Sequence, residues 1–237
     1  TAARWHGRAA DAAAQSNIMQ SISHCMAIIR LTKSLANTEE EKQIRLRGLY
    51  GFAMQGAWRI KLPDDQRDAL VEETCAIARS LGDEDIEVAA RSTFAYSISI
   101  LGGDLRNGLE TFEKLFNDIG ERDSETYLVA KHSAFPYNVL AAGQLERAQD
   151  LLLSGFHKTR GDYAQGIESW GFSLLCGMHG SNNAITAYRG QLKAAIDSSS
   201  SVLDNTMTEV DLPDDIAWAV SNVMLSILLM GIDPADP

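Results

Sequence analysis

Apolar residues recur every three or four positions along most of the chain, and polar residues fill the positions between them. The clearest stripe lies in residues 105–119, where leucines, phenylalanines and an isoleucine line one side of a helix. The same spacing returns in residues 145–156. Alternation with a period of two, which is typical of half-buried strands, is hard to find. The pattern therefore predicts an all-α fold.

Short breaks with helix-capping residues separate these stripes. Thr38 and Glu41 fit a capping box, in which each side chain binds the backbone N–H of the other residue. Leu-Pro-Asp-Asp occurs at both 62–65 and 212–215, where proline fixes a turn and the acids lie near the positive end of a helix. The breaks predict helices over residues 2–14, 17–36, 39–58, 64–81, 84–101, 104–119, 123–142, 144–158, 163–179, 183–198 and 214–230. The polar connection Ser198–Asp211 is expected to be a mobile loop or another short helix.

A ten-residue segment that begins at Gly103 is similar to one that begins at Gly143, 40 residues later. Both open at a tight turn and continue with a leucine two residues on. Five residues after the glycine, each carries a small residue, Gly108 or Ala148, where two helices could cross closely. Each segment follows a longer helix, so the repeating unit is a helix pair.

A weaker copy of this segment is expected after Gly180, with Ala184 at the small position. One helix pair cannot bury its apolar face alone, so stacked pairs that share a core are the stable arrangement. The spacing predicts an α-α superhelix of about five helix pairs, forming a single repeat domain over residues 1–237. A single compact bundle is the alternative.

The units resemble tetratricopeptide repeats. The run Ala3–Ala12, followed by Ser21–His24 and Leu31, and the later segment Gly161–Ser173 are similar to the helical repeat region of large bacterial multidomain signalling proteins. In those proteins an adenylate cyclase domain and an AAA-type ATPase domain precede the repeats. The same repeats occur in regulators that end in a LuxR-type DNA-binding domain. Pro136, inside an otherwise helical run, departs from the repeat pattern and is expected to kink its helix.

The resemblance implies a cytoplasmic, non-catalytic module for protein interaction and regulation. The first candidate parent is a multidomain adenylate cyclase, in which this module contacts another domain of the chain or a regulatory partner. The alternative is the same module in a LuxR-type transcription regulator. Both ends look cut, so we expect an excerpt of a larger protein.

The net charge of the chain limits the classes of binding partner that are expected. The chain has a formal net charge of −11 and a sequence pI near 4.9. Such a chain repels the phosphates of nucleic acids and the anionic face of a membrane. Polar residues interrupt the longest apolar stretches, so none is expected to span a bilayer. We expect a protein partner that is neutral or basic at the contact.

Thiols and imidazoles offer little sign of catalysis or metal binding. The cysteines Cys25, Cys75 and Cys176 lie in apolar helical patterns, which indicates reduced core thiols. Cys176 and His179 lie three residues apart, yet they supply two members of a zinc site or a nucleophilic centre without a third. The other histidines show no metal-ligand spacing: His6, His24, His132 and His157.

The remaining candidates for chemistry have simpler explanations. No phosphate-binding loop ending in Gly-Lys-Ser or Gly-Lys-Thr is present. Asp64–Asp65 and Asp214–Asp215 follow prolines. Helix capping explains these acids more simply than catalysis does. Ser198–Ser201 could be phosphorylated or simply solvated. The sequence predicts no catalytic residue, metal or cofactor; a small all-helical enzyme using Cys176, His179 or a carboxylate is the alternative from another class.

Large aromatic residues gather in the expected first helices of the pairs. Most should be core, and those left over could line a groove for an extended peptide or another domain. The candidate partner-binding residues are Tyr96, Tyr137 and Trp170. The full set is Trp58, Phe94, Tyr96, Tyr127, Phe135, Tyr137, Trp170 and Phe172.

Overall fold

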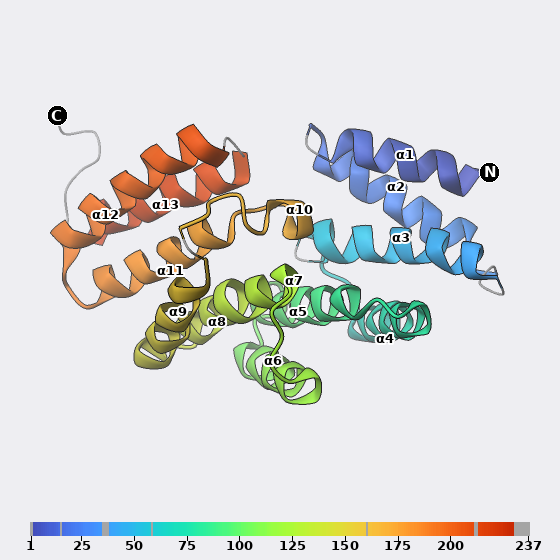
Figure 1. Cartoon of the computed structure of the whole chain (residues 1–237), viewed down its shortest axis with the longest axis horizontal. Helices are drawn as coiled ribbons and strands as arrows, with labels where there is room; N and C mark the ends of the chain where they lie inside the picture. Colours follow the sequence, from blue (N-terminus) through green and yellow to red (C-terminus); the bar gives the residue numbers. More distant parts are fainter. Residues whose placement is uncertain are drawn as a thin grey trace. The chain divides into compact units, whose positions relative to one another are not determined.

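The computed structural model of the chain is all-helical, as predicted (Figure 1). It describes residues 2–14, 16–34, 38–57, 59–159, 161–210 and 213–229, and none of these residues lies in a strand. Several expected positions lie outside the described residues, namely Trp58, Asp211, Leu212 and the helix ends at residues 36 and 230. No helix in the described part of the chain is both long enough and apolar enough to cross a bilayer.

The helices gather in two compact units, Thr1–Ile119 and Gly120–Pro237. We call them unit 1 and unit 2 and describe each by itself. The single repeat domain over residues 1–237 remains a prediction, because it concerns how the two units associate.

In the described part of unit 1 the helices form three pairs, and each helix packs on the next in chain order. The first helices α1, α3 and α5 also pack on one another in succession, which is the contact pattern of stacked helix pairs. The bounds are α1 Ala2–Ala13, α2 Ile18–Leu31, α3 Glu39–Gln55, α4 Asp64–Leu81, α5 Glu84–Ile100 and α6 Leu105–Ile119.

The caps of unit 1 explain why these boundaries are readable from sequence. Thr38 and Glu41 form the expected capping box at the start of α3. At the end of α4, Gly82 adopts a left-handed conformation with φ of 74°. Asp83 then caps α5 by accepting a hydrogen bond from the backbone N–H of Ile86 at 3.1 Å. Glycine suits this position because left-handed backbone costs it no Cβ clash.

The core of unit 1 lies where α2, α3 and α5 meet. Phe52 of α3 packs in one buried cluster with Ile22 of α2 and Phe94 of α5. The buried guanidinium of Arg45 adds hydrogen bonds between the helices of this unit. Arg45 of α3 is 5% exposed; its Nη2 donates to Glu73 Oε2 of α4 at 2.7 Å, and its Nη1 donates to the Ile29 carbonyl oxygen of α2 at 2.8 Å. Arg45 therefore connects three helices.

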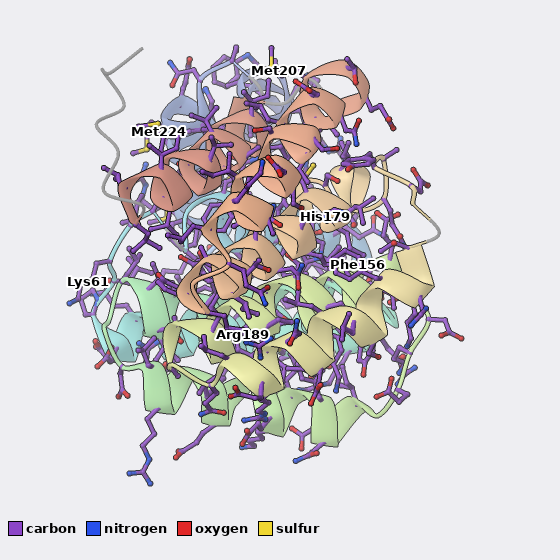
Figure 2. The ribbon with its side chains drawn as sticks, turned by 90° about the vertical axis from the view of Figure 1, so that its left-hand side faces the viewer. Lys61, Phe156, His179, Arg189, Met207 and Met224 are labelled. Atoms are coloured by element: carbon purple, nitrogen blue, oxygen red, sulfur yellow. The ribbon has the colours of Figure 1, made fainter. Side chains whose placement is uncertain are left out.

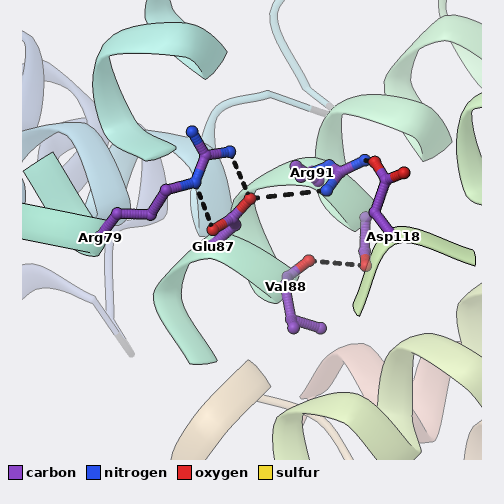
Figure 3. Close-up of polar contacts among 6 residues, drawn as sticks. Arg79, Glu87, Val88, Arg91 and Asp118 are labelled. Carbon is purple, nitrogen blue, oxygen red and sulfur yellow. Dashed lines mark hydrogen bonds and ion pairs between the residues drawn. The ribbon is translucent and has the colours of Figure 1, made fainter. Parts of the chain in front are cut away.

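A second ionic network connects the last three helices of unit 1 (Figure 3). Glu87 of α5 accepts two hydrogen bonds from Arg79 of α4, at 2.6 and 2.8 Å. Arg91 of α5 lies 3.5 Å from Glu87 and donates to Asp118 of α6 at 2.6 Å. Glu87 is buried, so its charge is stabilised by these two guanidinium groups.

In the described part of unit 2, two helix pairs are followed by α13. The first helix of the opening pair is continuous through α7, the π-helical turn η1 and α8, and it packs on its second helix, α9. The next first helix, α11, packs on α8 and α9 behind it and on α12 and α13 ahead of it. The bounds are α7 Glu125–Val129, η1 Ala130–Ala134, α8 Phe135–Ala141, α9 Leu145–Thr159, α10 Ile167–Trp170, α11 Leu174–Tyr188, α12 Leu192–Asn205, a second π-helical turn η2 Thr206–Val210 and α13 Pro213–Leu229.

The disturbance expected at Pro136 takes the form of the π-helical turn η1. The N–H of Phe135 donates to the carbonyl oxygen of Ala130, five residues back instead of four. Pro136 has no N–H to continue the regular ladder, and the wider turn ends just before it. The helix runs on through the proline to Ala141.

The helices expected over 163–179 and 183–198 are wrong. Gly166 and Gly171 adopt left-handed φ values of 96° and 75°, which confines helix α10 to four residues. Ser173 then starts α11 by accepting a hydrogen bond from the backbone N–H of Cys176. Gly180, where a break was expected, lies buried in the middle of α11; the break falls at Gly190, whose φ is 79°.

The connection expected at Ser198–Asp211 is helical as far as the structure describes it. Helix α12 continues through the serines to Asn205, and η2 carries the helix on to Val210. Ser199 is buried inside the unit, which explains why a run of serines need not be a solvated loop.

The corrected break reveals a third copy of the repeated turn. Gly143-Gln144-Leu145 recurs unchanged as Gly190-Gln191-Leu192. In both turns the glycine N–H donates three residues back and the glutamine N–H donates five residues back, a Schellman arrangement. The small residue five positions after each glycine, Ala148 or Ala195, is fully buried.

The small position of the first copy is also buried, as predicted. A Cβ added to Gly108 of α6 would clash with Ser99 Oγ and would lie 3.0 Å from the Ala95 carbonyl oxygen of α5. Gly108 and Ala148 thus lie where the two helices of a pair cross closely. The repeat derived from Gly103 and Gly143 is confirmed, and its third copy lies ten residues after the expected place.

Candidate functional site

The three candidate partner-binding residues lie in both units. Tyr96 is half-buried in α5 of unit 1. Tyr137, in α8, and Trp170, in α10, are half-buried in unit 2. Phe94, Tyr127 and Phe135 of the larger aromatic set are buried core residues. Phe172 is half-buried like the three candidates, so the described rings of this set are not mostly core as expected. That the half-buried rings share a face remains a prediction.

In unit 2, Tyr137 and Trp170 have different surroundings. The Tyr137 ring meets Trp218 of α13 edge to face, with ring centroids 5.2 Å apart. Trp170 packs on Phe172 with centroids 5.9 Å apart. The indole Nε1 of Trp170 is buried and has no hydrogen-bond partner in the described residues. A buried donor without an acceptor is costly, and a partner that supplied a carbonyl oxygen would remove that cost.

Cys176 and His179 have different neighbours in the structure. The Cys176 thiol lies 3.1 Å from the hydroxyl of Thr206, and burial raises the pKa of the thiol above its usual value. The His179 ring contacts that of Phe156, with centroids 4.8 Å apart, and stacks on that of Tyr163 with centroids 6.4 Å apart; Figure 2 labels His179 and Phe156. Burial lowers the pKa of His179, so the imidazole is held neutral in an aromatic setting.

The other two thiols are also poor nucleophiles. Cys25 and Cys75 are buried and free, and burial raises the pKa of each to about 11. A thiol reacts as its thiolate, so these pKa values make both groups inert near neutral pH. This agrees with core cysteines that contribute to packing.

The acidic pairs and the remaining buried histidine, His132, contact other groups of the fold. Asp64, at the start of α4, lies 2.7 Å from Arg67 in the same first turn. Both carboxylate oxygens of the buried Asp215 lie 3.2 Å from the backbone nitrogen of Ser173. His132 is buried in η1 with Nδ1 3.1 Å from the Leu151 carbonyl oxygen, and burial lowers its pKa. No group of three or more metal-ligating side chains occurs among the residues that the structure describes.

Two histidines that are far apart in the sequence meet in unit 1. His6 of α1 and His24 of α2 are 18 residues apart in the chain, yet their Nδ1 atoms lie 2.9 Å from each other. Trp5, which is 54% exposed, meets both imidazole rings nearly at right angles. Only the antiparallel packing of α1 on α2 brings these residues together, so no local spacing in the sequence could reveal them.

No protein-family model and no curated protein matches this chain. The resemblance to tetratricopeptide repeats of bacterial signalling proteins therefore depends on the residues quoted above. The helix pairing within each unit is the structural observation that agrees with it.

Proposed function

We propose that this chain is a non-catalytic module for protein interaction and regulation in a bacterial signalling protein, with a multidomain adenylate cyclase as the first candidate parent. The observation that carries the proposal is the order of helix contacts within each unit. First helices pack on first helices, as α3 does on α5 and α11 does on α13. Stacking of this kind gives each unit an extended layer of first helices, and helical repeat proteins bind partners on such surfaces.

The half-buried aromatic rings of the first helices support a contact surface there. Tyr96 and Tyr137 belong to first helices, and Trp170 lies on the short helix just before the next one. Aromatic side chains supply much of the binding energy at protein interfaces because they bury a large area with few rotatable bonds. The unsatisfied Nε1 of Trp170 adds a polar point for recognition.

The surroundings of the thiols and of His179 support a binding function more than a catalytic one. Burial raises the thiol pKa values, and the described contacts of His179 are with the rings of Phe156 and Tyr163. A general base and its nucleophile must come within hydrogen-bond reach of each other. Under this proposal the chemistry of the parent belongs to its other domains, and the regulatory contact belongs to this one.

The net charge of −11 favours a neutral or basic contact on the partner. In the proposed parent, that partner is another domain of the same chain or a separate regulatory protein. Added salt should weaken the encounter, since screening shortens the range of the attraction.

The test is cyclic-nucleotide production by the full-length parent with and without residues 1–237. We expect removal to change the response to effectors while the catalytic domain stays active. Trp170→Ala and Tyr137→Ala should reproduce part of that change. Tyr188→Ala is the matched control, because Tyr188 is an exposed ring at the end of α11. Identical output from all these proteins under every effector would refute the regulatory role.

A further inference from the structure

His6 and His24 form a polar contact between α1 and α2 that the proposed function does not use. The two helices are fixed to each other nearby, since the Ser21 hydroxyl of α2 donates to the Ala10 carbonyl oxygen of α1 at 2.8 Å. Both histidines are half-buried, so each side chain is partly accessible to solvent. A pair of ring nitrogens is therefore held at short range at the surface of unit 1.

The distance between the two nitrogens suits one class of metal ion. Imidazole nitrogens bind divalent transition metals at about 2.0–2.1 Å. An ion bonded at that length to two nitrogens 2.9 Å apart would see them at roughly a right angle. A tetrahedral zinc site needs a wider angle, with the nitrogens about 3.3 Å apart. A right angle is typical of tetragonal copper(II) and nickel(II), and copper(II) is the most tightly bound of the first-row divalent ions.

We propose that His6 and His24 chelate a tetragonal divalent ion of the copper(II) type through their Nδ1 atoms. Without metal, one Nδ1 donates a hydrogen bond to the other. When the ion binds, both rings tilt about their Nδ1 atoms, so that the lone pairs face the ion while the Nδ1 atoms stay about 2.9 Å apart. The hydrogen of the donor ring moves to the Nε2 of that ring, so the neutral pair releases no net proton. Water fills the remaining positions around the ion.

The charges around the pair are compatible with a dication. Arg4 of α1 is paired with Glu40, and Arg47, which packs over α1 at Gly7, is paired with Asp11. These carboxylates compensate the guanidinium groups on this side of the helix. The positive charges of Arg4 and Arg47 are therefore compensated, and Arg8 of α1 is exposed to solvent, where its charge is screened.

Calorimetric titration of the purified chain with copper(II) alone tests the proposal. We expect one site per chain, weakened at least about tenfold by either His6→Ala or His24→Ala, because each variant turns a two-point attachment into a single one. His157→Ala is the matched control, since His157 is an exposed histidine of α9 in unit 2, and it should leave this site unchanged.

A second measurement locates the ion without relying on affinity. Copper(II) quenches indole fluorescence at short range, and Trp5 lies 5.0 and 5.5 Å from the two imidazole centroids. Trp5→Phe should therefore keep the binding and lose most of the quenching. Electron paramagnetic resonance of the copper-bound chain should show coupling to two nitrogens, reduced to one in His24→Gln, with circular dichroism confirming that this variant is folded.

Three outcomes would overturn the proposal. Copper(II) binding that survives in both His6→Ala and His24→Ala would place the ion elsewhere. An equal loss in His157→Ala would indicate adventitious binding by surface imidazoles. Zinc binding as tight as copper binding would contradict the right-angled geometry.

Discussion

Single small residues determine how closely the two helices of a pair approach. Gly108, Ala148 and Ala195 occupy the same position after their turns, and all are buried. At Gly108 even one added carbon would meet α5. Leucines supply the apolar area of these helices, whereas the small residues set the distance between the helix axes.

The first prediction concerns this position. Ala148→Leu should lower the free energy of unfolding by about 1–3 kcal/mol, because the added carbons have no space at the crossing of α8 and α9. Urea unfolding followed by circular dichroism measures the change. Glu146→Ala, whose side chain is 85% exposed on the same helix, should leave the free energy of unfolding nearly unchanged. Equal stability of Ala148→Leu and the parent would contradict the close crossing.

The second prediction concerns pH and the histidines of unit 2. Burial lowers the pKa values of His132 and His179 below the ordinary 6.5, so the unfolded chain binds protons more readily than the folded chain. The stability from keeping them neutral is fully present above pH 6.5 and is lost as the pH falls through 6.5 towards the lowered values. The loss should approach about 1.4 kcal/mol per pH unit for each histidine.

Urea unfolding between pH 5 and pH 7.5 tests this dependence. His179→Phe should flatten the pH profile, since phenylalanine fits the aromatic surroundings and does not titrate. His157→Gln should keep the slope of the parent, because His157 is exposed. A pH profile that is unchanged in His179→Phe would show that this imidazole does not drive the acid sensitivity.

At the scale of helices, hydrogen bonds and ion pairs connect neighbouring helices of unit 1. Arg45 connects α2, α3 and α4, and Glu87 with Arg91 connects α4, α5 and α6. Bidentate guanidinium–carboxylate contacts fix the rotation of one helix against the next as well as their distance. Register between pairs in unit 1 therefore depends on polar geometry in addition to apolar packing.

The third prediction removes the centre of this network. Glu87→Ala should lower the free energy of unfolding by about 1–3 kcal/mol, because it leaves the largely buried Arg91 with one carboxylate instead of two. The exposed pair of Arg106 and Glu110 in α6 is the control, and Glu110→Ala should change the value by less than about 0.5 kcal/mol. If both variants unfold alike in urea, the network contributes no more than a surface ion pair.

The fourth prediction tests the corrected repeat register. Gly190→Ala should lower the free energy of unfolding by about 1–2 kcal/mol, since a side chain is strained at a φ of 79°. Gly190→Asn should cost less, because asparagine tolerates left-handed backbone better than alanine does. A stable Gly190→Ala variant in thermal unfolding would argue against the turn at this glycine.

The helices that were predictable have strong local signals at both ends. Helix α3 has its capping box at Thr38, and α4 ends at Gly82, so both boundaries follow from local chemistry. The helix boundaries after residue 160 could not be predicted, because glycine has different structural roles there. Gly166 and Gly171 break the helix, whereas Gly180 is packed inside one. Only tertiary contacts distinguish these roles.

The same limit explains the outcome for the candidate sites. The candidate rings Tyr96, Tyr137 and Trp170 are half-buried, but Phe172 is too, and helical periodicity did not distinguish it from the core rings. Two other contacts depend on residues far apart in the chain. They are the contact of His6 with His24 and the contacts of His179 with two aromatic rings. Periodicity within one helix carries no information about such pairs.

At the scale of the whole molecule, a short exposed linker separates the two units. Residues 120–123 are exposed and lie outside any helix, between the end of α6 and the start of α7. An arginine-specific protease at low concentration should therefore cut early after Arg122, because the linker needs no unfolding to enter the active site. Arg122→Gln should remove this cut in mass-spectrometric analysis of the fragments. Earlier cleavage within α5 would contradict the expected order.

The repeated turn has a consequence for where this chain accommodates length variation. The glycine of the turn recurs after 40 residues and then after 47. In all three copies a small residue follows the glycine five positions later. The additional length lies mainly between α9 and α11, where α10 and its flanking glycines interrupt the passage from one pair to the next. Insertions are thus absorbed between pairs, where they leave the close crossing within each pair intact. Trp170 lies in this longer connection, outside the close crossings of both neighbouring pairs, so a change of binding preference there need not alter either crossing.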